Sequence, residues 1–198
     1  MEPMMIDIPM PILTERLQIR GPREGDGYLM NQAIIESQES LKTWMEWAQK
    51  LPTAEESEIN TRRSTARWIL REDLRLLIFD RSGQSLLGGS GLHRIDWQKG
   101  RFEIGYWVRS SEEGKGYIRE ATAAITQFAF SALKARRVEI RCDAMNIRSA
   151  HIPRKLGFPL EGILKNDGLD AAGLQARDTL IFARTDIEGL PDVKARWG

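Results

Sequence analysis

The pattern of apolar and polar residues along the chain predicts a series of strands. Alternating residues, or short apolar runs between turn residues, mark the segments 14–20, 74–80, 86–96, 101–108, 136–144, 161–165 and 174–185. In 101–108, four apolar or aromatic side chains share one face: Phe102, Ile104, Tyr106 and Val108. Glu103 and Trp107 lie on the opposite face. This alternation is typical of a strand with two different faces.

Apolar residues spaced three and four apart predict helices between these strands. The helical segments are 24–37, 40–51, 53–72, 118–132 and 149–156. Thr53 and Glu56 resemble a capping box at the start of the third helix. Ser149 is a good N-cap for the last helix, and Gly157 is placed to end it.

The order of the segments predicts the fold class. Antiparallel strands come first, followed by strand–helix–strand–helix–strand, which indicates one mixed α/β (α+β) domain. This domain covers residues 1–198, with a core of about 12–186 and loose ends.

Composition and charge exclude several classes of partner. With 29 basic and 28 acidic residues the net charge is +1, which gives no electrostatic footprint for nucleic acid or a membrane surface. No apolar run approaches the ~20 residues that a spanning helix needs. The first residues lack a basic region and contain prolines, so they do not read as a signal peptide. The single cysteine, Cys142, excludes an internal disulfide and suits a reducing compartment, so we expect a cytoplasmic protein.

The stretch EEGKGYIREA, residues 112–121, joins a strand to a helix through two glycines. Such a turn leaves backbone N–H groups unpaired at the positive end of the helix dipole. Small residues let an anion come close, so Gly114–Tyr117 is a candidate diphosphate-binding turn. Lys115 would point to solvent, and Glu112 and Glu113 should point away from a bound phosphate. A plain tight turn is the alternative interpretation of the same glycines.

Motifs along most of the chain point to one family. FEIGYWV, GKGYIREA, RRVEIRC and NIRSAHIPRKLGF followed by LEG occur between Phe102 and Glu161, after TERLQIRGPREGD and LKTWMEW. In this order and at these spacings the motifs resemble the GNAT superfamily of N-acetyltransferases. The closest resemblance is to its RimJ/RimL branch, which modifies the N-terminal amines of proteins.

This resemblance implies a mostly antiparallel sheet with a splayed central pair of strands, flanked by helices, and acetyl-CoA as the cofactor. The diphosphate would lie on the glycine turn, and the pantetheine arm would pair like an added strand with the main chain of Tyr106–Val108. The implied cofactor-binding residues are Tyr106, Trp107, Val108, Gly114, Lys115, Gly116, Tyr117 and Asn146. Ser149 matches the position proposed to protonate the departing thiolate.

Fewer residues can be assigned to binding or deprotonating the acceptor amine. Glu103 occupies a position used for amine deprotonation in parts of the superfamily, although a cross-strand charge partner is an equally simple role. His93 stands in the preceding strand and is expected beside Glu103 across the hairpin, as a substrate-side residue. Trp44 and Trp47 would share one face of the 40–51 helix, where they would either wall an acceptor pocket or pack in the core.

The predicted reaction is direct attack of a primary amine on the acetyl group, with Glu103 and Ser149 as catalytic residues. An N-terminal α-amine has a pKa of ~7.7–8.0 and lysine ~10.4, so neutralising lysine costs roughly 3 kcal/mol more. This favours a protein N-terminus as acceptor; amino sugars and polyamines stay open, as does an acyl-CoA-binding module without turnover. Monomer and homodimer are both open.

Two positions depart from the family pattern. Ser111 stands where Gln or Arg is usual, three residues before the first glycine of the turn. Pro153 lies early in the helix after Ser149, where it removes a backbone donor and is expected to kink the helix. Both changes put the efficiency of CoA binding or catalysis in question.

Overall fold

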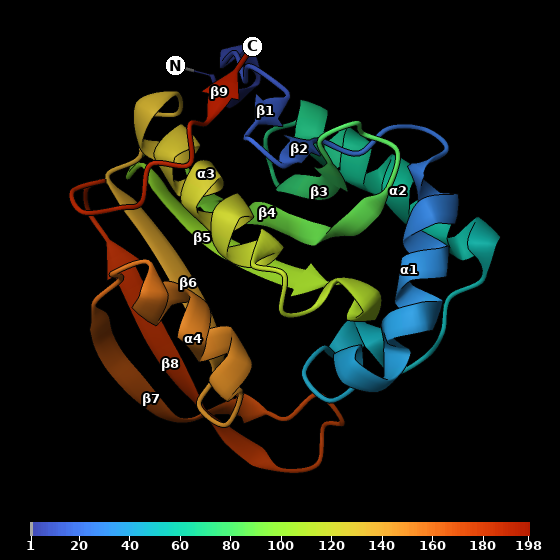
Figure 1. The fold of residues 1–198 in the computed structure, drawn as a ribbon. Helices are drawn as coiled ribbons and strands as arrows, with labels where there is room; N and C mark the ends of the chain where they lie inside the picture. The colour runs from blue at the N-terminus through green and yellow to red at the C-terminus, as the bar shows by residue number, and fades with distance from the viewer. Residues whose placement is uncertain (1) are drawn as a thin grey trace.

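The predicted strands join in one nine-stranded sheet in the computed structural model, which describes residues 2–198 (Figure 1). The strands are β1 (Ile12–Leu13), β2 (Leu17–Arg20), β3 (Leu74–Asp80), β4 (Leu86–Asp96), β5 (Arg101–Val108), β6 (Arg137–Asp143), β7 (Leu160–Leu169), β8 (Ala176–Arg184) and β9 (Arg196–Trp197). The helices are α1 (Asp26–Leu41), α2 (Ala54–Ile69), α3 (Tyr117–Ser131) and α4 (Ile147–Lys155). Short 3-10 helices are η1 (Pro3–Met5), η2 (Glu46–Ala48) and η3 (Ser110–Glu112).

The sheet is antiparallel except at its centre. Its order is β7-β8-β6-β5-β4-β3-β2-β1-β9, and β5 and β6 form the parallel pair. A parallel pair needs a crossover, which α3 supplies between β5 and β6. The mixed, mostly antiparallel sheet with flanking helices confirms the predicted fold class.

The parallel pair is hydrogen-bonded at one end only. Register partners run from Arg101↔Arg137 to Glu103↔Glu139, although β5 continues to Val108 and β6 to Asp143. Beyond Glu103 the two strands diverge, so the second half of β5 pairs with β4 on one side and has an open edge on the other. This is the splay that the family resemblance implied.

The two faces of the sheet pack against different helices, because successive side chains of a strand point to opposite faces. In β3, Leu76 and Ile78 belong to the same buried cluster as Phe128 of α3. Leu77 and Phe79 instead pack with residues of α1, among them Ile34. We call these the α3 face and the α1 face; α4 also lies on the α3 face, and Figure 1 shows α1 and α2 grouped on the opposite side from α4.

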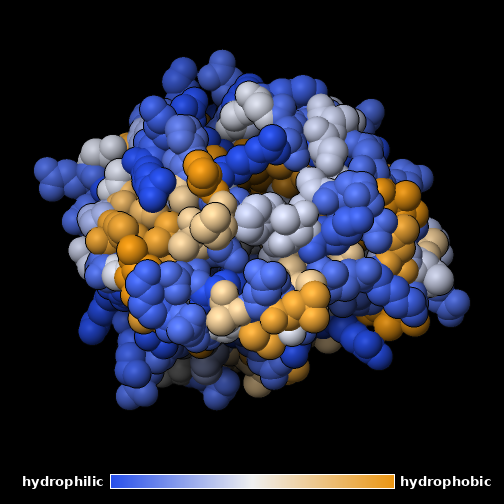
Figure 2. Space-filling model, turned by 90° about the horizontal axis from the view of Figure 1, so that it is seen from below, coloured by the Kyte–Doolittle hydropathy of each residue, from blue (hydrophilic) through white to orange (hydrophobic). Residues whose placement is uncertain are grey.

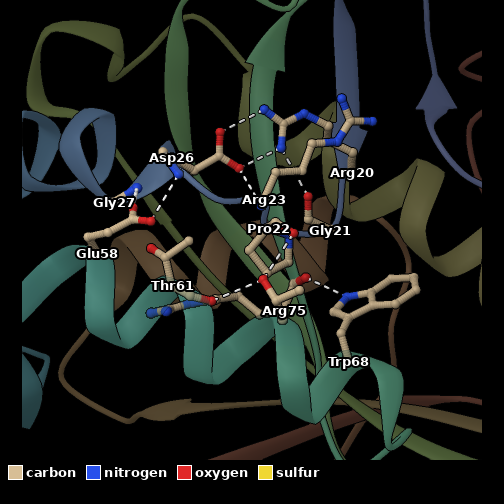
Figure 3. A network of polar contacts seen from close by, with 12 residues as sticks. Arg20, Gly21, Pro22, Arg23, Asp26, Gly27, Glu58, Thr61, Trp68 and Arg75 are labelled. Atoms are coloured by element: carbon tan, nitrogen blue, oxygen red, sulfur yellow. Dashed lines mark hydrogen bonds and ion pairs between the residues drawn. The ribbon is translucent and has the colours of Figure 1, made fainter.

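Polar contacts fix α1 and α2 to the sheet (Figure 3). The Arg20 guanidinium donates to both carboxylate oxygens of Asp26 at 2.6 and 2.9 Å, which ties the start of α1 to β2. The Glu58 carboxylate accepts the N–H of Gly27 at 3.0 Å and so joins α2 to α1. Trp68 at the other end of α2 donates its indole N–H to the Arg75 carbonyl at 2.8 Å. Helices α1 and α2 are thus held in place by buried or half-buried polar groups.

The predicted helix over 40–51 is wrong. α1 continues to Leu41, the chain then turns, and only Glu46–Ala48 forms a short 3-10 helix. Trp44 and Trp47 therefore do not share a helix face. The capping box of the next helix is confirmed: Glu56 N–H donates to Thr53 Oγ1 at 3.1 Å, and Thr53 N–H to Glu56 Oε2 at 2.7 Å.

The chain ends, expected to be loose, pack on the fold in this structure. Ile12 of β1 pairs with Trp197 of β9. The Trp197 ring lies edge-on to Phe128 of α3, with centroids 5.5 Å apart. Near the start, Ile8 and Met10 pack against the main core. Both chain ends contain apolar residues, and these residues pack against the hydrophobic core.

Candidate active site

The glycine turn forms the strand-to-helix connection that the sequence predicts. After β5 and η3, Gly114 and Gly116 adopt φ of +75° and +81°, and α3 begins at Tyr117. Glycine takes this left-handed conformation without steric cost. A Cβ built on Gly114 would meet nothing within 4 Å, so the turn is open on that side. The first N–H groups of α3 are thus accessible at the positive end of its dipole.

Each acid before the turn is paired with a cation. Glu112 contacts Lys115 at 2.9 Å, and Glu113 contacts Arg148 of α4 at 2.8 Å. These ion pairs offset the repulsion that the acids would exert on an anion at Gly114–Tyr117. They also mean that Lys115 is partly engaged within the turn rather than free in solvent.

Arg16 is a residue that sequence analysis missed. It comes from the connection between β1 and β2, yet donates to the carbonyl of Lys115 at 3.0 Å and pairs with Glu120 of α3 at 2.6 Å. Its guanidinium also lies 4.8 Å from the centroid of the Tyr117 ring. Arg16 therefore braces the turn and adds a positive charge beside it. No local motif signals this contact, because only the fold brings the two segments together.

The other side of the turn rests on α1. The Ser111 N–H donates to Glu36 Oε1 at 3.0 Å, and Arg109 donates to Glu36 Oε2 at 2.6 Å. The hydrogen bonds from Ser111, aided by Arg109, hold the pKa of the Glu36 carboxyl below its ordinary value. Ser111, which departs from the family pattern, is thus a structural contact between the turn and α1.

The open edge of β5 lies next to this turn. Gly88↔Val108 and Ser90↔Tyr106 are register pairs with β4, whereas the β5–β6 pairs end at Glu103. An exposed strand edge can hydrogen-bond an extended, amide-containing ligand. Figure 2 views the molecule from below, the side on which Figure 1 places the end of β5 and the first turn of α4. It shows a hydrophilic surface with hydrophobic residues at the bottom of a hollow.

On the α3 face, Tyr106 meets the helix α4. Its hydroxyl donates to the Ser149 carbonyl at 2.8 Å, and the Ser149 hydroxyl lies 3.4 Å from Tyr106 Oη, to which it donates. Pro153 has no N–H, so it cannot bond the carbonyl of the residue four positions earlier, which is Ser149. The Tyr106 hydroxyl takes the place of the missing helix donor. Burial raises the pKa of Tyr106 strongly, which keeps it a neutral donor.

The expected N-cap of α4 needs correction. α4 runs as one helix through Pro153, from Ile147 to Lys155. Ser149 is not its N-cap: Asn146 is, and Asn146 Oδ1 accepts the Ser149 N–H at 2.9 Å. Because Asn146 caps the helix, the Ser149 hydroxyl is free to face Tyr106. Cys142 of β6 is buried, and this burial raises the pKa of its thiol.

Glu103 and His93 lie side by side on the α1 face. They are register partners across the β4–β5 hairpin, as the sequence predicts. Glu103 Oε2 is 3.6 Å from Arg94 Nε and 3.5 Å from Arg141 Nε. His93 instead has Nδ1 2.6 Å from the Asp73 carboxylate. Glu103 is therefore part of a charge network, while His93 forms an imidazole–carboxylate pair that sequence analysis did not find.

The two tryptophans of the 40–51 segment have different surroundings. Trp47 packs edge-on against Trp107 of β5, with ring centroids 6.2 Å apart and planes at 63°. It thereby covers the α1 face at the end of β5, next to the glycine turn. Trp44 lies in the turn after α1, and both side chains are partly exposed. A role for them in acceptor binding stays a prediction.

Two other kinds of site find no support within residues 2–198. No group of three or more His, Cys, Asp or Glu side chains could hold a metal ion there. Over the same residues, no helix combines the length and the apolar character needed to cross a membrane.

Comparison with known proteins identifies the family. The model of the acetyltransferase (GNAT) domain matches residues 16–159. YdaF of Bacillus subtilis (strain 168), named as a candidate ribosomal N-acetyltransferase, is 30% identical over 82% of this chain and 87% of its own length. The ribosomal-protein-serine acetyltransferase of Escherichia coli (strain K12) is 28% identical over 83% of this chain and 94% of its own.

A solved structure shares the fold. The ribosomal L7/L12 α-N-protein acetyltransferase RimL, in complex with CoA, superposes with a TM-score of 0.81. It is 21% identical and the match covers 88% of this chain and 97% of RimL. The family model, the two relatives and the splayed sheet agree, and the chain belongs to the GNAT family of acetyltransferases.

Proposed function

We propose that this protein transfers the acetyl group of acetyl-CoA to the α-amine at the N-terminus of a protein. The observation that carries the proposal is the open edge of β5, which runs from the glycine turn to the Tyr106–Ser149 contact. The names of the relatives supply the acceptor class: one acetylates serine of a ribosomal protein, and the CoA-bound structure is of an α-N-protein acetyltransferase.

The residues present fit CoA. The diphosphate is placed on Gly114–Tyr117, which is open at Gly114. Arg16 and Lys115 lie beside the turn, each in an ion pair with a glutamate. The pantetheine arm is placed along the main chain of Tyr106–Val108, in the position of an added strand. Asn146 uses its side-chain oxygen to cap α4, which leaves its amide nitrogen for the arm. When bound, acetyl-CoA supplies the activated acetyl group.

The chain's own residues then have two tasks. One group must take a proton from the amine as it attacks, and another must give a proton to the departing thiolate. Ser149 is the proposed donor, because Tyr106 holds its carbonyl and its hydroxyl at the open edge of β5. Glu103 and His93 are the candidates for the base, both on the α1 face.

The pKa of the acceptor favours a protein N-terminus over a lysine side chain. At pH 7 an α-amine is partly neutral, whereas freeing lysine of its proton costs roughly 3 kcal/mol more. An amine that is already partly deprotonated at pH 7 suits a site with a single weak base. An acceptor on a ribosomal protein also implies a cytoplasmic enzyme, in line with the single cysteine.

The test is a comparison of acceptors with purified protein and acetyl-CoA. Peptides with a free N-terminal serine or alanine are compared with the same peptides blocked at the N-terminus but carrying lysine, and with glucosamine and spermidine. We expect thiol release and a mass gain of one acetyl group on the free N-terminal peptides only. Consumption of a small amine instead would assign a small-amine acetyltransferase. CoA binding without release of thiol with any acceptor would overturn catalysis and favour a binding module.

A further inference from the structure

An imidazole–carboxylate pair lies on the α1 face beside the open edge of β5. Asp73 stands just before β3, and its Oδ2 is 2.6 Å from Nδ1 of His93 on β4. An ionised carboxylate can only accept a hydrogen bond, so in the neutral imidazole Nδ1 carries the proton. The other nitrogen, Nε2, then has a free lone pair. This is the arrangement of a base whose tautomer is set by a neighbouring acid.

The ring of His93 lies over two glycines of the central hairpin. A Cβ built on Gly91 would be 2.5 Å from Nε2, and one built on Gly105 would be 3.5 Å from it. Side chains at these positions would displace the ring or cover Nε2. The His93 side chain is 33% exposed, so the ring is not sealed in the core.

The following step rests on the proposed function. A pantetheine arm that starts at the glycine turn runs back along β5 from Val108 towards Tyr106. It cannot extend past Glu103, because β5 and β6 pair again there. An arm on this course would bring its thioester end near Gly105, whose backbone is next to the His93 ring.

The two faces of the sheet then offer different groups to the thioester. Tyr106 and Ser149 lie on the α3 face, while His93 and Glu103 lie on the α1 face. Glu103 shares its Oε2 between Arg94 and Arg141, at 3.6 and 3.5 Å. It is also fixed in a strand that pairs with Glu139. Of the two candidate bases, His93 is the one whose partner is an anion, whereas the Glu103 carboxylate lies between two guanidinium groups.

We propose that His93, oriented by Asp73, is the catalytic base and that Glu103 is a structural charge partner. The attacking amine nitrogen bonds to the acetyl carbon while one of its protons passes to His93 Nε2. The C–S bond breaks, and the thiolate takes the proton of the Ser149 hydroxyl, which is replaced from solvent. The imidazolium, stabilised by Asp73, returns its proton to solvent. Asp73 is a positioning residue, since it acts through His93.

The test compares His93→Gln, Asp73→Asn and Glu103→Gln with a free N-terminal serine peptide as acceptor. His93→Gln should lower kcat by ~10²-fold or more, with KM for acetyl-CoA within about twofold. Asp73→Asn should lower kcat about tenfold or more, because the imidazolium loses its negative partner and the Asn amide N–H can favour the wrong imidazole tautomer. The acid limb in the pH profile of kcat/KM should become less steep in His93→Gln, where only protonation of the amine remains, and should keep its wild-type slope in Glu103→Gln. His151→Gln is the matched control, since His151 is the other histidine and lies exposed on α4.

A second readout separates loss of a base from loss of structure. Both enzymes use the neutral amine, so protonation of the amine cancels in the ratio of their kcat/KM values. This ratio of wild type to His93→Gln should rise with pH, because an imidazole acts as a base only after it has lost its proton. A His93→Gln variant as active as wild type, a ratio that stays constant with pH, or an acid limb that becomes less steep in Glu103→Gln alone would overturn the proposal. Absence of transfer by wild type would instead contradict the proposed function.

Discussion

The hydroxyl of Tyr106 donates to the main-chain carbonyl of Ser149 at 2.8 Å, and so fills the place of the helix N–H that Pro153 lacks. A side chain on β5 thereby completes the hydrogen bonding of α4. The contact ties the strand expected to carry CoA to the helix that carries the candidate acid. Its strength can be measured, because each partner can be changed separately.

Tyr106→Phe should lower the free energy of unfolding by about 1–3 kcal/mol, because the buried Ser149 carbonyl loses its donor. The measurement is urea unfolding, with Tyr28→Phe as the control because Tyr28 is 56% exposed. In Tyr106→Phe combined with Pro153→Ala, the new N–H at 153 can bond that carbonyl. The double variant should lose less than the sum of the two single variants. Equal losses for Tyr106→Phe and Tyr28→Phe would contradict this account.

Gly114→Ala should weaken CoA binding in addition to destabilising the fold. Gly114 and Gly173 have φ of +75° and +74°, and a Cβ at either meets nothing within 4 Å. Both alanine variants should therefore lose about 1–2 kcal/mol of stability from backbone strain alone. Calorimetric titration with CoA should show a Kd raised about tenfold or more in Gly114→Ala and unchanged in Gly173→Ala. A matching loss of affinity in both would argue against the glycine turn as the diphosphate site.

Arg16→Ala should also raise the Kd for CoA, by about tenfold, because one bond to a charged group is worth roughly 1.5–3 kcal/mol. Arg16 both braces the carbonyl of Lys115 and places a cation at the turn. The control is Arg63→Ala, since Arg63 is exposed on α2 and its loss changes the net charge equally. The effect should shrink at high salt, because the charge part is screened. If both variants bind CoA as wild type does, Arg16 has no part in the cofactor site.

Glu139→Gln should make stability less dependent on pH in acid. Burial opposes ionisation of Glu139, but the hydrogen bonds and charges of Arg137 and Arg141 outweigh it, so its pKa is lowered. A lowered pKa gives stability that is present above the unfolded value of ~4.3 and is lost as the pH falls through the folded value.

At pH 7 the variant should therefore be about 1.5–3 kcal/mol less stable. This difference should shrink as the pH falls below ~4. Urea unfolding over a pH series measures it, with Glu72→Gln as the exposed control. A difference that stays constant down to pH 2.5 would show that Glu139 contributes no pH-dependent stability.

Local patterns predicted most of the sheet. The segments 74–80, 86–96 and 101–108 match β3, β4 and β5 residue for residue. Their alternation and the turns between them are local properties that survive folding. The prediction of a 40–51 helix was wrong, and in the structure Trp47 packs on Trp107, a partner 60 positions along the chain that local spacing does not reveal.

The site was predictable only where a motif is contiguous. The glycine turn and the hairpin pairing of His93 with Glu103 follow from neighbouring residues. Asn146 and Ser149 are both good caps, and only the geometry of the turn shows that Asn146 takes the role. Arg16 and Asp73 could not be found, since each reaches its partner through the fold rather than through a motif.

The divergence of β5 and β6 after Glu103 gives the sheet an opening that can be approached from either side. Acetyl-CoA and the acceptor protein could then enter from opposite sides of the sheet. A large protein N-terminus could bind while the cofactor is already bound. The two substrates should add in a sequential mechanism through a ternary complex, giving intersecting rather than parallel double-reciprocal lines.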